Sequence, residues 1–584
     1  MKNLITKTHT SSFVNIDNDE QIVTYIINQF HTFINVVRAV LGISPKYMTM
    51  SIIFCLASFR TNSQIILNND SLVSDFKYLT TQLEATHPDP YSGFGGRVFF
   101  FKTTHKVIED IRKNHYTQQA FIDTINAFLS NLQDGHTHIF KPDNSEELTR
   151  YAPIRFKVIP EQLIVEGIRT KNKELIGSRL DSINGVAVNN WLNYVASQVP
   201  CENLYGRYSM LSRVAYKNTF LNRFSTNSND SVRYSLHTPD DKTVSLTFSY
   251  IAEDSLQYFD MTYTPEWKNY PSGYISYAFT DNSKQTMLFR ASLIMARENF
   301  DYTLAHQWEN AYSQMQDFYK YTLRHEMPKD TTEALAGIPS FSATFANMLM
   351  EMKKNQSKNL IIDLRRNSGG WTPITLPTLL MLYGDRYLTT EKNIIFYRRI
   401  SPLYLNKINK TLEQYNEGNH SDYQLGDYVL DEENITANTS SINEQRKDFI
   451  DNSMSMSNTR KMLSDLQGTP LYQPQKVYVI TDEKTFSAAF HYAFYLWKMG
   501  AIIVGVPSSQ APNTFMEQTP FQLPYGKLNG CISNSLQVFM PAQDRRAKTF
   551  YPDSIPTYQT YKKFNFDYHT EIRYLLDFIK ESHQ

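Results

Sequence analysis

Apolar positions repeat with two different periods along this chain, and the change of period divides it into regions. From about residue 70 to residue 140, apolar side chains recur at helical spacing, which predicts a mostly helical region. From residue 153 to about residue 250, they alternate as in short strands, and an Asn184-Gly185 pair is typical of a tight hairpin. The predicted helices of the first region are 71–84, 100–114 and 118–132.

The second half of the chain alternates strands with helices. The predicted strands are 273–279, 360–364 and 477–481, and the predicted helices are 340–354, 374–383 and 488–498. An order of strand, helix, strand, turn and helix indicates an α/β arrangement with right-handed crossovers.

Ser487 stands at the junction of an apolar run, 477–481, and the predicted helix 488–498. A serine at a strand-to-helix turn exposes its hydroxyl beside backbone N–H groups. Those groups are needed to attack a carbonyl and to stabilise the resulting oxyanion. Taken alone, such a serine is more typical of a helix N-cap, and two further segments favour the catalytic interpretation.

A glycine pair follows the predicted strand 360–364, in the sequence Asn367-Ser-Gly-Gly. Consecutive glycines accept positive φ and let the backbone approach a ligand closely. The N–H of Gly369 or Gly370 is therefore a candidate for one oxyanion donor, and the N–H of Ala488 for the other. Without Ser487, the segment would be read as an ordinary turn.

His136 lies just after the predicted helix 118–132, in the sequence Asp134-Gly-His-Thr. A histidine on a loop beyond a helix end can reach a distant site, and neutral imidazole is the usual base for a serine hydroxyl. A lone histidine is more often structural, so His136 gains weight only from the other two segments. His491, four residues after Ser487, is interpreted as a packing residue.

These three segments resemble the motifs of the C-terminal-processing (tail-specific) and tricorn-core serine proteases. The family pattern is Asp-Gly-His-Thr early, Asp-Leu-Arg-x-Asn-x-Gly-Gly in the middle and Thr-x-Ser-Ala late. The resemblance extends from about residue 75 to residue 553, which is most of the chain.

The resemblance implies a role for each candidate residue. Ser487 would be the nucleophile, and His136 would be the base of the branch that uses histidine. Ala488 and either Gly369 or Gly370 would supply the oxyanion hole. The branch that uses a lysine base is nearly excluded, because no lysine lies between residues 498 and 527.

The acid that would orient His136 is less clear from the sequence. The histidine branch usually has a glutamate shortly before a Pro-Asp pair, but Arg546 stands at about that position before the pair at 552–553. Asp544 is our first candidate for this acid and Glu517 is the second. An asparagine or a water molecule is a further alternative, since the orienting group mainly fixes a tautomer.

By resemblance, the fold class is α/β, with a Clp-protease/crotonase-like catalytic core, an N-terminal helical domain and a PDZ-like β-rich module. The PDZ-like core lacks a clear carboxylate-binding loop, so we interpret the module as a lid or spacer. The predicted regions are a leader at 1–66, the helical domain at 67–150, the PDZ-like module at 151–260, catalytic parts at 261–405 and 467–584, and a flexible insertion at 406–466.

Composition agrees with a large globular enzyme and excludes several partners. The 58 basic and 58 acidic residues cancel, which gives no reason to expect nucleic acid or an anionic membrane as a partner. Cys55, Cys201 and Cys531 fit neither a metal site nor a disulfide framework. We therefore predict no cofactor and no metal, and a Cys201–Cys531 bridge stays open.

The N-terminal region contains a candidate secretory signal. Lys46 precedes a short apolar core that ends in small residues at about residue 58, as in a signal peptide. We therefore expect export to the periplasm or the extracellular space, with a short buried helix as the alternative. Beyond this region, the sequence predicts no stable membrane insertion.

The sequence therefore predicts a serine endopeptidase of the tail-specific type, which cleaves peptide or protein substrates by acyl transfer. One alternative is an inactive relative that binds a peptide or a hydrophobic small molecule, which the missing glutamate and the 14% aromatic content favour. An unrelated esterase is disfavoured, because Ser487 is not part of a Gly-x-Ser-x-Gly motif.

Overall fold

The structure is a computed structural model. It describes residues 68–140, 149–224, 230–261, 270–271, 273–308, 310–432 and 441–581. The predicted leader, with Cys55 and the signal-like stretch after Lys46, lies outside the described residues. Within them, no helix combines the length and the apolar character needed to cross a membrane.

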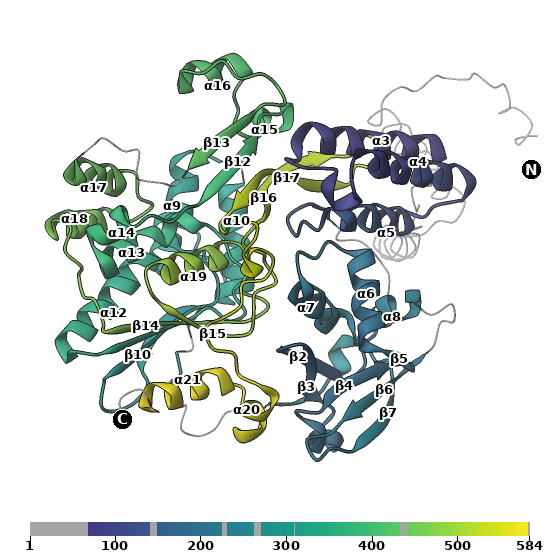
Figure 1. Ribbon diagram of the computed structural model, residues 1–584, viewed down its shortest axis with the longest axis horizontal. Coiled ribbons are helices and arrows are strands. Elements are labelled where there is room, and N and C mark those ends of the chain that lie inside the picture. The colour runs from purple at the N-terminus through teal and green to yellow at the C-terminus, as the bar shows by residue number, and fades with distance from the viewer. Residues whose placement is uncertain are drawn as a thin grey trace, which may run out of the picture. The chain divides into compact units, whose positions relative to one another are not determined.

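Helices begin the described chain (Figure 1). They are α3 (Asn69–Thr86), η1 (Ser92–Phe94), α4 (Arg97–Lys113), α5 (Gln118–Leu129) and η2 (Ser130–Leu132). Their shared core includes the aromatic side chains of Phe76, Phe100 and Phe128. α3 begins where Asn68 Oδ1 accepts the N–H of Ser71 at 2.8 Å, and α5 begins where Thr117 Oγ1 accepts the N–H of Ala120 at 3.2 Å. All three helices predicted for this region are confirmed.

An antiparallel sheet with three helices forms the β-rich region (Figure 1). Its elements are β2 (Ile154–Ile159), β3 (Gln162–Ile168), η3 (Thr170–Leu175), β4 (Arg179–Ile183), β5 (Val186–Ala187), α6 (Val188–Gln198), α7 (Leu204–Val214), α8 (Asn218–Phe224), β6 (Ser231–His237), β7 (Thr243–Ser249), η4 (Glu253–Ser255) and β8 (Phe259–Asp260). The strand order is β2-β3-β4-β6-β7, with β5 on β4 and β8 on β3. Asn184 and Gly185 have φ of 51° and 79°, which confirms the predicted hairpin. The likeness to a PDZ domain stays a prediction.

A mostly parallel sheet carries the catalytic candidates. Its strands are β9 (Ile275–Phe279), β10 (Thr286–Ala291), β11 (Asn359–Asp363), β14 (Lys476–Thr481) and β15 (Ile502–Gly505). Its covering helices are α12 (Phe341–Asn355), α13 (Leu376–Tyr383), α19 (Ala488–Lys498) and α21 (Thr570–Glu581). The order is β15-β14-β11-β10-β9, and only β9 runs antiparallel to its neighbour. The predicted α/β fold is confirmed.

This sheet is buried on both faces, as expected of parallel strands. Leu360 and Ile362 pack in the core shared with α12, α13 and α19. The intervening Ile361 packs on the opposite face with Ile572 and Leu575 of α21. α19 and α21 accordingly lie on opposite sides of the strands (Figure 1).

A second sheet joins segments from both ends of the described chain. Its strands are β1 (His138–Ile139), β12 (Ile395–Arg399), β13 (Tyr428–Glu432), β16 (Thr514–Gln522) and β17 (Asn529–Val538). Their order is β1-β17-β12-β13, with β16 also paired to β17. Because His138 pairs with Cys531, the loop that carries His136 is attached to the C-terminal half of the chain.

The predicted flexible insertion at 406–466 is folded in its described part. The helices of this segment are the end of α15 (Pro402–Lys407), α16 (Leu412–Asn419), α17 (Ile442–Asp451) and α18 (Ser457–Asp465). The remaining helices, outside this segment, are α9 (Arg297–Ala305), α10 (Ala311–Phe318), η6 (Tyr319–Leu323), α11 (Thr331–Gly337), η7 (Thr372–Ile374), α14 (Asp385–Thr389), η9 (Arg545–Ala547) and α20 (Tyr558–Lys563). β13 pairs with β12, and Ile450 of α17 and Leu463 of α18 join the main core. The few apolar residues of this segment therefore lie where they anchor helices, which the low apolar content concealed.

Candidate active site

Ser487 occupies the turn between β14 and α19 in a conformation that is unusual for a residue with a side chain. Its φ is 53° and its ψ is −125°. It stands at the N-cap position, but its side chain makes no capping hydrogen bond, so the simpler N-cap interpretation does not explain it. Non-glycine residues at such φ/ψ carry about 1–3 kcal/mol of strain and cluster at functional sites.

Hydrogen bonds from two strands hold this strained turn. Thr485 Oγ1 donates to the carbonyl of Leu364 at 2.9 Å, and the N–H of Phe486 donates to the carbonyl of Asn367 at 3.0 Å. The N–H of Ser487 donates to Gln510 Oε1. The ends of β11 and β14 are therefore joined directly below the nucleophile candidate.

The glycine pair lies against this turn, and its two N–H groups differ. The N–H of Gly369 donates to Asn367 Oδ1 at 2.9 Å. Ile294 bonds the carbonyl of Gly369 and the N–H of Trp371, both at 2.8 Å, and leaves the N–H of Gly370 unused. Among the described residues, the N–H groups of Gly370 and Ala488 have no hydrogen-bond acceptor. Of the two predicted glycines, Gly370 is thus the better candidate for an oxyanion donor.

Gly369 lies so close to the nucleophile turn that a larger residue would displace this turn. Its φ is +103°, and an added Cβ would lie 2.7 Å from Ser487 Cβ and 2.9 Å from the backbone nitrogen of Ala488. We expect Gly369→Ala to lower kcat by about 10²–10³-fold, as loss of an oxyanion donor does. Gly206→Ala is a matched control, because its Cβ would meet no atom closer than 3.5 Å. Steady-state kinetics check the pair, and equal kcat values for both variants would contradict the assigned role of Gly369.

The loop that carries His136 comes close to the nucleophile turn. The imidazole of His136 stacks on Phe486, with ring centroids 4.9 Å apart and planes 25° apart. Within the described residues, neither ring nitrogen makes a hydrogen bond of ordinary length. Burial lowers the pKa of His136, against the charge of Asp134. The ring is therefore neutral at pH 7, as a general base requires.

Glu202, which the sequence did not indicate, is the carboxylate beside His136. Its Oε1 lies 3.8 Å from His136 Nδ1, and its side chain is buried. Oε2 accepts the N–H of Ala511 at 2.8 Å, and Oε1 accepts the N–H of Gly135 at 3.3 Å. Burial raises the pKa of Glu202 to about 8, despite these hydrogen bonds.

Asp134 fixes the backbone of the same loop. Its Oδ1 accepts the N–H of His136 at 2.8 Å, and its Oδ2 accepts the hydroxyl of Thr137 at 2.5 Å. His87 Nδ1 accepts the N–H of Asp89, so its Nε2 carries the proton that faces Asp134 Oδ2 at 3.3 Å. Burial opposes ionisation, but the contacts with His87 and Thr137 lower the pKa of Asp134 to about 2.

Both ring nitrogens of His491 have a hydrogen-bond partner. Its Nε2 lies 2.8 Å from Gln537 Oε1, and its Nδ1 lies 2.8 Å from Thr372 Oγ1. Gln537 Nε2 donates to the carbonyl of Pro512, so Gln537 Oε1 faces His491 and accepts from it. Burial lowers the pKa of His491 to about 4. This supports the packing interpretation, in which a neutral His491 ties α19 to β17 and η7.

The structure gives the predicted orienting acids other partners. Asp544 caps η9 and pairs with Arg546, whose Nη2 lies 3.0 Å from Asp544 Oδ2. Glu517 lies 3.5 Å from Lys407 Nζ. Asp544 therefore neutralises the arginine that replaces the expected glutamate, and the carboxylate nearest to His136 comes from the β-rich region instead.

Asp134, His136 and Glu202 also have the chemistry of a metal site, since one potential ligand atom from each lies within 4.8 Å of the others. Both carboxylates, however, already accept backbone N–H donors at this site. Donors aimed at carboxylate oxygens compete with a cation for the same lone pairs. The arrangement favours a hydrogen-bonded loop anchor over coordination.

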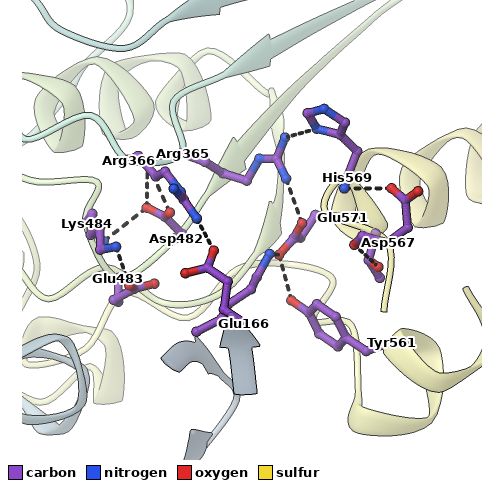
Figure 2. Close-up of polar contacts among 12 residues, drawn as sticks. Glu166, Arg365, Arg366, Asp482, Glu483, Lys484, Tyr561, Asp567, His569 and Glu571 are labelled. Carbon is purple, nitrogen blue, oxygen red and sulfur yellow. Dashed lines mark hydrogen bonds and ion pairs between the residues drawn. The ribbon is translucent and has the colours of Figure 1, made fainter. Parts of the chain in front are cut away.

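A buried charge network at the end of β11 supports the glycine segment that follows this strand (Figure 2). Arg365 lies 2.8 Å from Asp363 and 2.6 Å from Glu571, and Lys157 of the β-rich region lies 2.6 Å from Glu571. Burial opposes ionisation of Glu571, but Lys157 and Arg365 lower its pKa. Loss of one partner would leave a buried charge unpaired, which is strongly destabilising.

Arg366 extends this network to the nucleophile turn (Figure 2). Its backbone N–H donates to both oxygens of Asp482, at 2.9 and 3.0 Å. Its side chain forms an ion pair with Glu166 of β3. Asp482 in turn accepts the N–H of Lys484 at 3.0 Å. The glycine segment, the nucleophile turn and the β-rich region are thereby linked through one arginine.

The two described cysteines are separate thiols rather than a disulfide. Burial raises the pKa of Cys201 to about 12 and that of Cys531 to about 11. Both are therefore protonated and weakly nucleophilic at neutral pH, which leaves the serine as the nucleophile candidate at this site.

Comparisons with known proteins agree with this geometry. Residues 334–528, about a third of the chain, match the sequence model of peptidase family S41. No curated protein matches the sequence. The crystal structure of mature CPAF matches with a TM-score of 0.54 and 14% identity, over 86% of this chain and 96% of that chain. The complex of mature CPAF with lactacystin matches with a TM-score of 0.51 and 13% identity, over 88% of this chain and 98% of that one. At these identities the structural matches establish the fold.

Proposed function

We propose that this chain is a serine peptidase of the tail-specific type, as its match to peptidase family S41 over residues 334–528 supports, and that Ser487 and His136 are the residues with which it hydrolyses peptide bonds. Gly370 and Ala488 would supply the oxyanion hole, and Glu202 would stabilise the charged form of His136. The observation that carries this proposal is the strained φ of 53° at Ser487, whose hydroxyl is not used as a helix cap.

The proposed reaction is an acyl transfer in two halves. His136 takes the proton of Ser487 Oγ while that oxygen bonds to the peptide carbonyl carbon. The carbonyl oxygen becomes an anion, which the N–H groups of Gly370 and Ala488 stabilise. The C–N bond then breaks, and His136 gives its proton to the leaving amine. A water molecule, deprotonated by His136, attacks the acyl group and releases Ser487.

Glu202 predicts an unusual pH dependence. Its pKa of about 8 means that it is mostly neutral at pH 7 and ionises as the pH rises. Since an anion beside His136 stabilises imidazolium, we expect kcat/KM to rise through about pH 8. Glu202→Gln should flatten this rise and lower the plateau by about 10²-fold. A triad acid that bonds its histidine directly would cost about 10⁴-fold when removed. The expected loss is smaller here, because the 3.8 Å between Glu202 Oε1 and His136 Nδ1 is longer than a hydrogen bond.

The same group predicts the direction of a stability change. In the unfolded chain the Glu202 carboxyl ionises near its usual pKa of 4.5, but in the folded chain its pKa is about 8. Between these values the folded state holds more protons, so the contribution of Glu202 to stability falls as the pH rises. Urea unfolding of Glu202→Gln and wild type at pH 5 and pH 8 should show the variant gaining relative stability at pH 8. An unchanged difference would contradict the raised pKa.

A fluorophosphonate probe tests the proposed nucleophile. The full chain should be labelled at Ser487, as mapped by peptide mass spectrometry, and Ser487→Ala should not be labelled. His136→Ala should be labelled much more slowly, since the base is missing. An unlabelled but folded wild-type protein would favour an inactive relative that binds its ligand without cleaving it.

We also propose that the protein is an endopeptidase and that it is exported. Endopeptidase activity on peptides or proteins is supported by the match to peptidase family S41. Export rests on the signal-like residues after Lys46, and N-terminal sequencing of the mature protein from its host would test it. An N-terminus before residue 46 would overturn export by cleavage of this segment.

A further inference from the structure

A cavity of about 510 Å³ lies between the second sheet and the loop that follows α3. Its volume is typical of small-ligand sites, which span about 300–1,000 Å³. The lining residues are Pro88, Asp89, Pro90, Tyr91, Tyr397, Arg399, Tyr428 and Leu536. None of them belongs to the proposed catalytic machinery.

Strand pairing places the floor of this cavity on one face of the sheet. Tyr397 pairs with Leu536, and Arg399, two residues along β12, pairs with Tyr428. Paired and alternate residues share a face, so these four side chains form one patch. Gln537, the next residue of β17, points to the opposite face and contacts His491. The cavity and the packing side of α19 are therefore on different faces of β17.

The walls of the cavity are rigid and aromatic. The hydroxyl of Tyr91 donates to Glu84 Oε1 at 2.6 Å, and the hydroxyl of Tyr428 donates to the carbonyl of Pro88. Both rings are thereby fixed as walls. The hydroxyl of Tyr397, in contrast, has no hydrogen bond with any residue that the structure describes, so it is available to a ligand.

The cavity contains an arginine without a carboxylate partner. Arg399 Nη1 donates to the carbonyl of His87 at 3.2 Å, and Arg399 Nε is buried without a partner in the described part of the chain. The guanidinium lies 5.7 Å from the centre of the Tyr428 ring. Asp89 lines the same cavity, and its Oδ1 accepts the N–H groups of Tyr91 and Ser92. The Arg399 side chain is half-buried, and none of its N–H groups has a carboxylate acceptor among the described residues. Guanidinium donors without such an acceptor favour an anionic ligand.

We propose that this cavity binds a free carboxylate attached to an apolar or aromatic group. Arg399 would hold the carboxylate through its remaining N–H donors, since a guanidinium matches the geometry of a carboxylate. Tyr397 would donate a further hydrogen bond, and the prolines and tyrosines would enclose the apolar group. The carboxylate comes either from the C-terminus of a peptide or from a small organic acid, which share this chemistry.

Calorimetric titration of the full-length Ser487→Ala variant tests the site without any cleavage. The probes are N-acetyl-phenylalanine and a pentapeptide ending in phenylalanine, each compared with its C-terminal amide. We expect the free acids to bind and the amides to bind at least about tenfold more weakly, because a charge-assisted contact is lost. Preference for the pentapeptide would identify a chain terminus as the source, and equal binding would identify a small acid.

Variants separate a built site from unspecific binding. Arg399→Gln should weaken binding of the free acids at least about tenfold, and Tyr397→Phe should weaken it by about two- to tenfold. Arg398→Gln is the matched control, because Arg398 is adjacent on the same strand and points to the other face. Equal binding of acids and amides, no binding of either acid, or full binding by a folded Arg399→Gln variant would each overturn the proposal. None of these outcomes depends on whether the protein cleaves peptides.

Discussion

Replacement of Ser487 by alanine is expected to abolish peptide hydrolysis, with a loss of about 10⁶-fold in kcat. The reason is that the proposed acyl bond forms on Ser487 Oγ, and the raised pKa values of the Cys201 and Cys531 thiols make them weak nucleophiles. Hydrolysis of a fluorogenic peptide library by wild type and variant measures the effect. Activity within tenfold of wild type would identify a different nucleophile.

A glycine at the same position separates catalysis from strain. Because the φ of Ser487 is 53°, alanine retains the strain of the serine, whereas glycine adopts this conformation freely. Ser487→Gly should therefore be inactive but more stable than Ser487→Ala by about 1 kcal/mol. Urea unfolding of both variants checks this, and equal stability would show that the turn is relaxed.

Replacement of His136 by alanine is the second large expected effect, with a loss of about 10⁴–10⁶-fold in kcat/KM. The neutral, buried imidazole beside Phe486 is the only described histidine that stacks on the nucleophile turn without a hydrogen bond at either nitrogen. Without it, the serine hydroxyl must lose its proton to water. Rates of hydrolysis and of fluorophosphonate labelling should fall together.

Two neighbouring histidines serve as controls for this result. His138→Ala should remain within about tenfold of wild type, because the ring of His138 packs against Phe140 and not against the nucleophile turn, and the backbone pairing of His138 with Cys531 does not need the side chain. His491→Gln should mainly lower stability, since His491 connects Thr372 and Gln537 through hydrogen bonds of 2.8 Å. If His491→Gln lost more activity than His136→Ala at equal folding, the roles of the two histidines would have to be exchanged.

Most helices and strands of the fold could be predicted from the local pattern of apolar and turn-forming residues. The helix at 488–498 was predicted with the bounds of α19, because its apolar residues and the preceding polar turn agree. The Asn184-Gly185 hairpin was predictable because only a few residues accept positive φ at two successive positions. The glycine pair was also informative, since an added Cβ at Gly370 would lie 1.9 Å from the carbonyl oxygen of Ile294.

Glu202 could not be predicted, because its role is created by tertiary structure alone. It lies two residues before α7 in the β-rich region, in a segment with no motif and no periodic signal. The expectation of Asp544 came from the position of a glutamate in the family, and position along the chain does not report which side chains meet. Only the hydrogen bonds to Ala511 and Gly135 show where Glu202 is directed.

The folded state of the described part of 406–466 was missed for a related reason. Composition reports an average, whereas Ile450 and Leu463 act individually by inserting into the main core. The strain at Ser487 could likewise not be predicted, because this backbone dihedral depends on hydrogen bonds from the turn to Leu364, Asn367 and Gln510, which are distant in the sequence.

The pairing of His138 with Cys531 has a consequence for how the enzyme matures. The two residues are about 390 positions apart, so a ribosome must complete nearly the whole polypeptide before the histidine arm can dock. Contacts of such long range form late and slowly. A chain that ends after Ser487 but before residue 531 would thus contain both His136 and Ser487 but lack the strand residue on which the histidine arm docks, so its base would not be held beside its nucleophile.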